Sequence, residues 1–421
     1  MKEPKIRFKG FEGEWEEVLI EEAFGFLKNN SLSRAELSDH GNVVNIHYGD
    51  VLIKYPDCLD VEKEDVTFVK DLSLANKLYR SCPLQKGDVI FADAAEDNTV
   101  GKCTELVNCN SPIISGLHTI PVRPLKSYAS RYLGYYLNSP SYHNQLLVHI
   151  QGTKISSISK RALTQTMVVA PKALPEQQVI ASYFTHLDTI ITTSASRLAS
   201  LKQMKAASLQ AMFPQEGETV PKIRFKGFEG EWETVKLSEC LEISNERNLN
   251  NDFGTNEVLS VSDEEGVMNQ IKLLGRSYAG KSVTNYKVLR TNQVVYTKSP
   301  LKAKPYGIVK VNKGEIGIVS VLYAVYNAKD GVSPDYIHYY FEPTFRINNY
   351  LLPLINKGAK NTMNISDEAS LQGNIVIPKT IDEQCKIVDY FQSLDRQITL
   401  QSQRLEKLKQ VKATCLDKMF V

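Results

Sequence analysis

The sequence has 421 residues, of which 42% are hydrophobic and 23% charged, and its formal net charge is +2. This composition is ordinary for a globular protein and excludes disordered and fibrous classes, while the length indicates two to four domains. No apolar run approaches the roughly 18 residues that span a bilayer, and the first residues contain no apolar signal core. We therefore expect a cytoplasmic protein without a membrane contact. The seven cysteines form no C-x-x-C pair or zinc-ligand cluster, so no metal site is expected.

The chain begins with a segment that occurs twice. Residues 4–16 read PKIRFKGFEGEWE, and residues 221–233 repeat this segment without a change. A second match aligns PEQQVIASYFTHLDTII from Pro175 with DEQCKIVDYFQSLDRQI from Asp382. A period this long indicates a duplicated domain rather than a stack of short repeats. The expected organisation is a globular domain over 1–173, a helix over 174–213, a linker over 214–220, a second globular domain over 221–380 and a second helix over 381–421.

The two globular parts predict a mixed α/β fold. They contain short β-branched and aromatic runs bounded by Gly and Pro, such as HTIPVRP, VVYTKS, GIVKV and GIVSVLYAVY. Such runs are typical of strands, and helices are expected near residues 128–137 and 334–341. We expect two similar domains that contain twisted β-sheets.

Each globular part also contains a long stretch without an acidic residue. The first stretch, Leu106 to Pro175, contains seven Lys or Arg, and the second, Gly266 to Gly314, contains ten. Basic blocks suit a polyanionic partner, because each cation placed against a phosphate releases a condensed counterion. The alternative is that these are solvated surface residues whose acidic partners lie elsewhere in the fold.

Each of the two helices carries a heptad seam, in which spacings of four and three residues alternate as in a coiled coil. Eight of the ten seam positions hold the same residue in both helices. A helix of about 39 residues is about 58 Å long, too long for one such domain to bury. We expect the helices to pair antiparallel, with the domains at opposite ends and a pseudo-twofold axis between them. The seams consist of Ile180, Phe184, Leu187, Ile191, Ser194, Leu198, Leu201, Lys205, Ser208 and Met212, and of Ile387, Phe391, Leu394, Ile398, Gln401, Leu405, Leu408, Lys412, Cys415 and Met419.

Two similar basic domains on a rigid strut suggest a ruler for double-stranded DNA. With about 3.4 Å per base pair, a strut of this length places the half-site centres between one and two helical turns apart. The two globular sequences differ, so the half-sites should differ as well. The predicted site is bipartite, asymmetric and interrupted by bases that the protein does not read.

At this point the residues carry a resemblance to a known family. The pattern [P/D]-E-Q-x-x-I-x-x-Y-F-x-x-L-D-x-x-I, present twice, and the duplicated F-x-G-F-x-G-x-W resemble the specificity subunits of type I restriction-modification systems. The resemblance covers essentially the whole chain, and it implies that the globular parts are target recognition domains. It also implies two modification subunits, which use S-adenosylmethionine, and two restriction subunits, which use ATP and Mg²⁺. The chain itself would be non-catalytic and would bind no cofactor.

For DNA contact we favour polar and basic residues in three segments, QGTKISSISKR, KSPLKAKPY and NKGAKN. Lysines and arginines here could reach phosphates, and an aromatic ring could pack against a sugar or base. Each choice competes with a solvated surface role. The candidates are Gln151, Lys154, Lys160 and Arg161 in the first domain, and Lys298, Lys302, Lys304, Tyr306, Lys357, Lys360 and Asn361 in the second.

Two other motifs are weaker. GRSYAGKS at 275–282 satisfies the P-loop pattern, but the residues that follow it read as loop and strand rather than helix. The duplicated FKGFEG precedes a tryptophan at the start of each unit and predicts a packing turn rather than a cofactor loop.

Two alternatives come from other functional classes. A self-sufficient nuclease or methyltransferase lacks a catalytic motif here, since nothing resembles the tetrapeptide with which adenine methyltransferases hold a flipped base. An adaptor that binds only proteins is disfavoured by the basic blocks, and a low-salt DNA-binding assay would test it.

Overall fold

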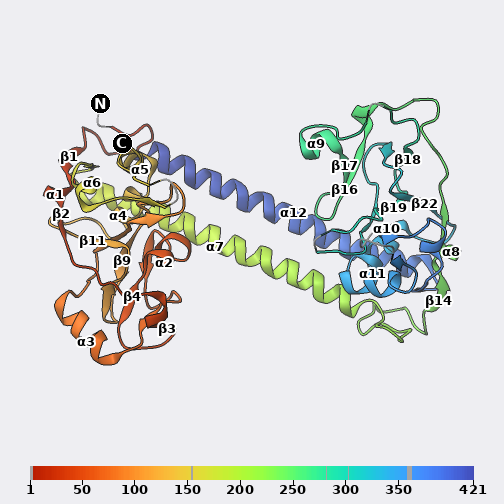
Figure 1. Ribbon diagram of the computed structural model, residues 1–421, viewed down its shortest axis with the longest axis horizontal. Coiled ribbons are helices and arrows are strands. Elements are labelled where there is room, and N and C mark those ends of the chain that lie inside the picture. The colour runs from red at the N-terminus through yellow and green to blue at the C-terminus, as the bar shows by residue number, and fades with distance from the viewer. Residues whose placement is uncertain (1–2, 153–154, 281, 302, 358–362) are drawn as a thin grey trace. The chain divides into compact units, whose positions relative to one another are not determined.

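The computed structural model describes residues 3–152, 155–280, 282–301, 303–357 and 363–421. Its contacts divide the chain into two compact units. Unit 1 comprises Met1–Ala195 with Gln403–Val421, and unit 2 comprises Ser196–Ser402. Each unit therefore combines one globular domain with part of both long helices, α7 (Leu174–Ala211) and α12 (Ile381–Lys418) (Figure 1).

Unit 1 is built on a five-stranded and a four-stranded sheet. Its strands are β1 (Glu16–Leu19), β2 (Phe24–Phe26), β3 (Leu37–Ser38), β4 (Val44–Ile46), β5 (Cys58–Asp60), β6 (Phe68–Val69), β7 (Val89–Ala92), β8 (Ala94–Ala95), β9 (Cys103–Asn108), β10 (Ile113–Ser115), β11 (Thr119–Pro124), β12 (Ser156–Ser157) and β13 (Met167–Ala170). The larger sheet has the order β2-β11-β7-β9-β5 and is antiparallel except for the pair β5 and β9. The smaller has the order β10-β4-β6-β3, in which only β10 and β4 are parallel.

Short helices cover and connect these strands. They are α1 (Ile20–Ala23), α2 (Tyr48–Ile53), α3 (Leu72–Ser81), α4 (Tyr132–Leu137), α5 (Pro140–Leu147) and α6 (Lys160–Thr164), with a 3₁₀ turn at Arg34–Glu36. The helix expected from residue 128 begins only at Tyr132. The residue before it, Arg131, has a φ of 75°, and this left-handed backbone does not continue a right-handed helix.

Unit 2 repeats the central strand order. Its strands are β14 (Glu233–Lys236), β15 (Leu241–Ile243), β16 (Leu259–Ser262), β17 (Gly266–Asn269), β18 (Lys287–Leu289), β19 (Val294–Tyr296), β20 (Val309–Val311), β21 (Gly317–Val319), β22 (Ala324–Ala328), β23 (Asn356–Lys357), β24 (Met363–Asn364) and β25 (Asn374–Ile377). The main sheet, β15-β22-β19-β20, is antiparallel and matches the order β2-β11-β7-β9 of unit 1. The helices are α8 (Leu237–Cys240), α9 (Gln270–Leu274), α10 (Pro334–Phe341) and α11 (Thr344–Leu351), with 3₁₀ turns at Thr255–Glu257 and Ala369–Leu371.

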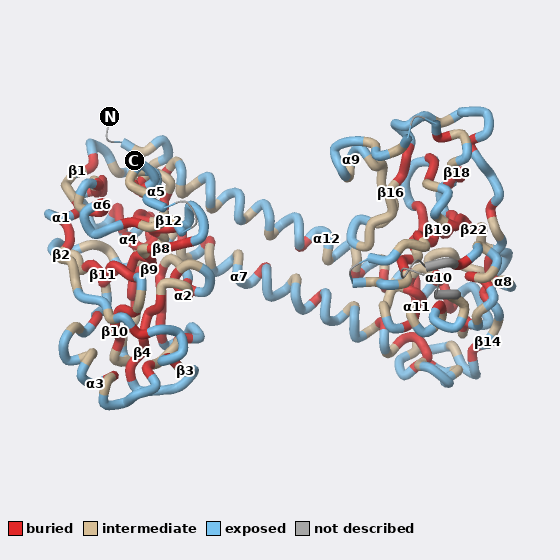
Figure 2. Tube along the Cα trace, in the orientation of Figure 1, coloured by how far each residue is buried: buried red, intermediate tan, exposed pale blue. Residues whose placement is uncertain are grey.

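The last turns of each long helix enter the core of a unit. In unit 1 the ring of Phe420 lies 5.7 Å from Phe184 and 5.6 Å from Tyr136. In unit 2 the ring of Phe213 lies 5.9 Å from Phe391 and 5.5 Å from Tyr336. Because large aromatic rings dominate core energetics, these contacts anchor a helix end in each core. Figure 2 shows that the buried residues of both units concentrate in the strands and in the helices packed on them.

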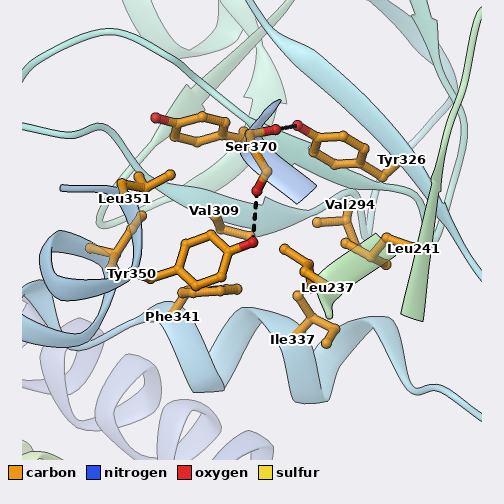
Figure 3. Close-up of a pocket in the computed structure, with 12 residues that line it drawn as sticks. Leu237, Leu241, Val294, Val309, Tyr326, Ile337, Phe341, Tyr350, Leu351 and Ser370 are labelled. Carbon is orange, nitrogen blue, oxygen red and sulfur yellow. Dashed lines mark hydrogen bonds between the residues drawn. The ribbon is translucent and has the colours of Figure 1, made fainter. Parts of the chain in front are cut away.

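The core of unit 2 contains a small apolar cavity between α10, α11 and the main sheet (Figure 3). Its volume is about 20 Å³, which is the space of a single water molecule. The hydroxyl of Tyr350 donates to the backbone carbonyl of Ser370 at 2.7 Å, and the hydroxyl of Tyr326 bonds the Ser370 hydroxyl at 2.6 Å. The cavity is therefore a packing gap beside satisfied polar groups, too small for a ligand.

These observations confirm the expected fold class, a mixed α/β chain with two similar globular domains and two long helices. In each unit the parts of α7 and α12 run antiparallel, because later positions on α7 meet earlier positions on α12. In unit 1 Tyr183 contacts Cys415 and Asp188 contacts Lys412, and in unit 2 Lys205 contacts Asp395 and Ser208 contacts Tyr390. The ten predicted seam positions of each helix are all buried or half-buried. No helix in the described ranges is long and apolar enough to cross a membrane.

Candidate nucleic-acid interface

A lysine in the seam of α12 binds the helix to both α7 and the first globular domain. The ammonium group of Lys412 lies 2.9 Å from the carboxylate of Asp57 and 2.7 Å from that of Asp188. It also lies 5.4 Å from the ring centroid of Tyr135, whose hydroxyl donates to Asp188 at 2.9 Å. Burial on its own would lower the pKa of Lys412, but the two carboxylates outweigh it and raise the pKa. The lysine is therefore charged and holds three segments together.

Unit 2 contains a similar arrangement around the equivalent lysine of α7, but its second carboxylate comes from another segment of the fold, since Asp57 precedes β5 and Glu342 follows α10. Lys205 lies 2.5 Å from the carboxylate of Glu342 and 2.6 Å from that of Asp395. Its ammonium group is 5.5 Å from the ring centroid of Tyr339, which donates to Asp395 at 2.8 Å. The lysine, the tyrosine and the helix aspartate occupy equivalent positions in the two repeats, which indicates that these three residues belong to the ancestral unit. The contacts of both lysines join a long helix to the globular domain of its unit.

The duplicated start of each repeat is also a packing element. Arg7 donates to the carboxylate of Glu176 at 2.7 Å and to the backbone carbonyl of Gly13 at 2.7 Å. Arg224 binds Glu383 at 2.7 Å in the same way. The glutamates belong to the E-Q segments that open the long helices and are almost fully buried. The FKGFEG turn therefore joins the first residues of each repeat to its helix, as the sequence predicted.

The DNA-contact candidates of unit 1 lie on its surface. Gln151, Lys160 and Arg161 are exposed. The backbone of Gln151 pairs with Ser157 next to the short β8–β12 ladder, and the ammonium group of Lys160 lies 3.3 Å from the carbonyl of Leu27. Arg161 has no ion pair among the described residues. These three side chains remain predictions for DNA contact, and Lys154 lies outside the described residues.

The candidates of unit 2 are more enclosed. Lys298 binds Asp367 at 2.5 Å, and Lys304 binds Asp263 at 2.9 Å and the carbonyl of Glu342 at 3.0 Å. Both lysine side chains are mostly buried. Tyr306 is half-buried and packs against the core of the unit. Lys357 belongs to β23, and Lys302, Lys360 and Asn361 lie outside the described residues.

The structure favours the alternative interpretation for much of the second basic block. Six of its basic residues have an acidic partner within 4 Å in the described chain: Lys287, Arg290, Lys298, Lys304, Lys310 and Lys313. The partners stand outside the acid-free stretch in sequence, as Asp263 and Asp367 do. Sequence distance therefore concealed the neutralisation, and the block carries less free charge than its composition indicates.

Two polar clusters beside these residues were not expected from the sequence. In unit 1, Nδ1 of His118 lies 3.1 Å from the carboxylate of Asp93, and the imidazole is half exposed. In unit 2, Lys287 and Lys298 share the carboxylate of Asp367. Burial on its own would raise the pKa of Asp367, but the two lysines outweigh it and lower the pKa. No pattern in the sequence pairs these residues, because they come from segments that are distant along the chain.

The P-loop pattern at 275–282 forms no nucleotide site in the part of it that the structure describes. Gly275 ends α9 with a φ of 77°, and no helix follows within the described residues 282–286. A P-loop needs a helix N-terminus at this point to hold phosphates. Across the described ranges, no group of three or more His, Cys, Asp or Glu side chains is placed to hold a metal ion.

The comparisons with known proteins agree with this architecture. The family model described as type I restriction modification DNA specificity domain matches residues 12–203 and again residues 229–410. The chain therefore belongs to the family of type I specificity subunits, which are non-catalytic DNA-recognition proteins. No curated protein matches the sequence.

Two solved structures resemble the fold. One is the S subunit of a type I restriction-modification system from M. genitalium, which is 12% identical, with 100% of this chain and 99% of that chain covered and a TM-score of 0.57. The other is a chain from a study of complex assembly and conformational transition of the type I R-M system. It is 16% identical, with 96% and 97% covered and a TM-score of 0.53. At these identities the likeness shows the fold alone.

Proposed function

We propose that this chain reads a bipartite, asymmetric site in double-stranded DNA, one half-site with each globular domain. The main support is that the model of one specificity-domain family matches this chain twice, while the sequences of the two globular domains have diverged. Domains that share a strand order but differ in their surface side chains suit two half-sites of different sequence. A spacing of one to two helical turns between the half-sites is part of this proposal.

The proposal includes a role in assembly. The chain would bind two modification subunits and two restriction subunits, with the paired helices as the platform for the modification subunits. S-adenosylmethionine, ATP and Mg²⁺ would be bound by those partners, and this chain would bind none of them. The lysine clusters around Lys205 and Lys412 support this role, because they fix the helix surfaces that a partner would meet.

Methylome sequencing tests both parts. Cells that carry this chain with its cognate modification subunit are compared with cells that lack only this chain. A gapped, asymmetric N6-methyladenine motif that disappears with the chain is the expected result and identifies both half-sites. If the methylation pattern is unchanged although the modification subunit is active, an adaptor that binds only proteins becomes the better explanation.

A further inference from the structure

Both globular domains contain a cleft, and the two clefts lie at the same place in the fold. Cleft 1, in unit 1, has a volume of about 410 Å³ and is lined by residues that include Asn30, Asp93 and Leu117. Cleft 2, in unit 2, has a volume of about 340 Å³ and is lined by residues that include Arg247, Lys298 and Val321. Neither was expected from the sequence.

The strand registers establish that these linings are equivalent. Phe91 of β7 pairs with Ile120 of β11, as Tyr296 of β19 pairs with Ala324 of β22. Asp93 and Lys298 each stand two residues after the first member of these pairs. Leu117 and Val321 each stand three residues before the second.

A third side of each cleft is formed by residues that follow the neighbouring strand, which is β2 in unit 1 and β15 in unit 2. Phe26 of β2 pairs with Val122, as Ile243 of β15 pairs with Tyr326. Asn30 and Arg247 each follow four residues later. Three positions that flank three separate strands therefore line a cleft in both domains.

The two clefts differ in chemistry. In cleft 1, Asp93 accepts from Nδ1 of His118 in the tautomer that leaves Nε2 free to accept a hydrogen bond, and the imidazole is half exposed. Cleft 2 is lined by three basic side chains, Arg247, Lys287 and Lys298, and by two acidic ones, Asp367 and Glu368. Lys287 and Lys298 both bind Asp367. The equivalent position after β7 and β19 is thus an acidic residue, Asp93, in unit 1 and a basic residue, Lys298, in unit 2.

We propose that the two clefts contact base edges in the two half-sites, with His118 and Arg247 as specificity-determining residues. This inference rests on the proposed function. Arg247 is exposed, and a bridge between its backbone and that of Lys287 holds it in place. Nη1 of Arg247 donates to the carbonyl of Asn285, which leaves its other donors for the acceptor pair O6 and N7 of a guanine. A phosphate offers similar acceptors, so the experiment must separate the two.

The test is methylome sequencing of full-length His118→Gln and Arg247→Gln chains with the modification subunit. Each variant should relax the base preference at one position by about tenfold or more, in opposite half-sites, and Arg247→Gln should do so at a guanine. His40→Gln and Arg276→Gln, exposed residues of the same types outside the clefts, should keep the wild-type motif. Unchanged motifs in both cleft variants, or changes in the same half-site, would overturn the inference.

If a cleft variant loses all methylation, binding of the purified complex to duplex DNA is measured instead. If that variant also unfolds at a lower temperature than the wild-type chain, His118→Asn or Arg247→Lys replaces it. Loss of affinity for the specific duplex alone supports base reading. An equal loss on specific and random duplexes indicates a phosphate contact and overturns it. Failure of the proposed function is distinguishable, because the wild-type chain would then direct no gapped motif.

Discussion

The ammonium group of Lys412 lies 2.7 Å from the carboxylate of Asp188, so the last turns of α12 are bound to the first half of α7. Asp188 and Asp57 are both largely enclosed around this lysine. A buried ion pair of this kind adds little net stability compared with an apolar substitute, but it is costly to break from one side. It also favours one register of the helices over others.

Replacing Lys412 with methionine should therefore destabilise unit 1. The change keeps the length of the side chain but leaves two carboxylates without a cation, and we expect a loss of about 2 kcal/mol, less than for a fully buried pair. Thermal unfolding and hydrogen exchange of unit 1 measure it. Adding Asp188→Asn should recover part of the loss, whereas Lys409→Met, an exposed position on α12, should change stability by less than about 0.5 kcal/mol. Equal effects of the two lysine changes would contradict this role.

Phe420, just after the end of α12, should contribute more to the stability of unit 1 than Lys412 does. Phe420 is almost fully buried and its ring contacts Tyr132, Tyr136 and Phe184. Phe420→Ala should lower the free energy of unfolding by about 3–5 kcal/mol, because the cavity adds to the lost transfer energy. Hydrogen exchange should accelerate in the strands of unit 1. Leu400→Ala, at an exposed position of α12, should leave exchange unchanged. Normal protection after Phe420→Ala would show that the helix end is not anchored.

One histidine should give unit 2 a pH dependence. Burial first, and then the neighbouring Lys310, lower the pKa of His338 to about 3. Below the unfolded value of about 6.5, the unfolded chain gains a proton that the folded chain does not, so stability is lost as the pH falls from about 6.5 toward 3. At pH 5 this loss is about 2 kcal/mol. His338→Gln keeps a donor for the carbonyl of Val309 and should remove this part of the acid sensitivity.

Thermal unfolding at pH 7 and pH 5 checks this prediction. The wild-type chain and His40→Gln, a change at an exposed histidine, should lose stability in parallel as the pH falls. His338→Gln should lose less. A parallel loss in all three chains would mean that His338 does not titrate on unfolding.

Neutralising one acid should strengthen nonspecific DNA binding. Asp263 holds Lys304 at 2.9 Å and Lys310 at 3.6 Å. In Asp263→Asn both lysines lose their carboxylate partner, so the complex should bind random duplex several-fold more tightly at low salt. The slope of log K against log salt should steepen by about 0.9 for each additional phosphate contact.

A salt titration of binding measures this slope. Asp252→Asn, an exposed acid of the same domain, provides the control and should change neither affinity nor slope by as much. An unchanged slope in Asp263→Asn, at an unchanged unfolding temperature, would place the KSPLKAKPY segment away from DNA.

Several features could be predicted because they are periodic or repeated in the sequence. The heptad spacing predicted the two long helices, and the structure places them at Leu174–Ala211 and Ile381–Lys418. The duplicated segments predicted two similar domains, and both contain the same order of central strands. α10 spans Pro334–Phe341 as expected, because Ser333 caps it and Pro334 suits its first turn.

The candidate site was less predictable. A block without acids indicated free positive charge, but Lys298 and Lys304 have carboxylate partners that stand 69 and 41 positions away in the sequence. Composition counts charges along the chain, whereas neutralisation depends on distance in space. His118 and Arg247 belong to no motif, and only the strand registers bring them to equivalent clefts.

The sequence by itself determined the family, the duplication and the long helices, because each follows from the spacing of nearby residues or from segments that occur twice. The tertiary structure decided which segments share a core. Phe420 packs on Tyr132 and Tyr136, nearly 300 residues earlier, so unit 1 is closed by the helix of the second repeat. No local pattern encodes which helix end packs in this core, because the hydrophobic effect is not directional and would favour burial against any apolar surface. The choice depends on the shape of the core and on buried ion pairs, which form only in the folded chain.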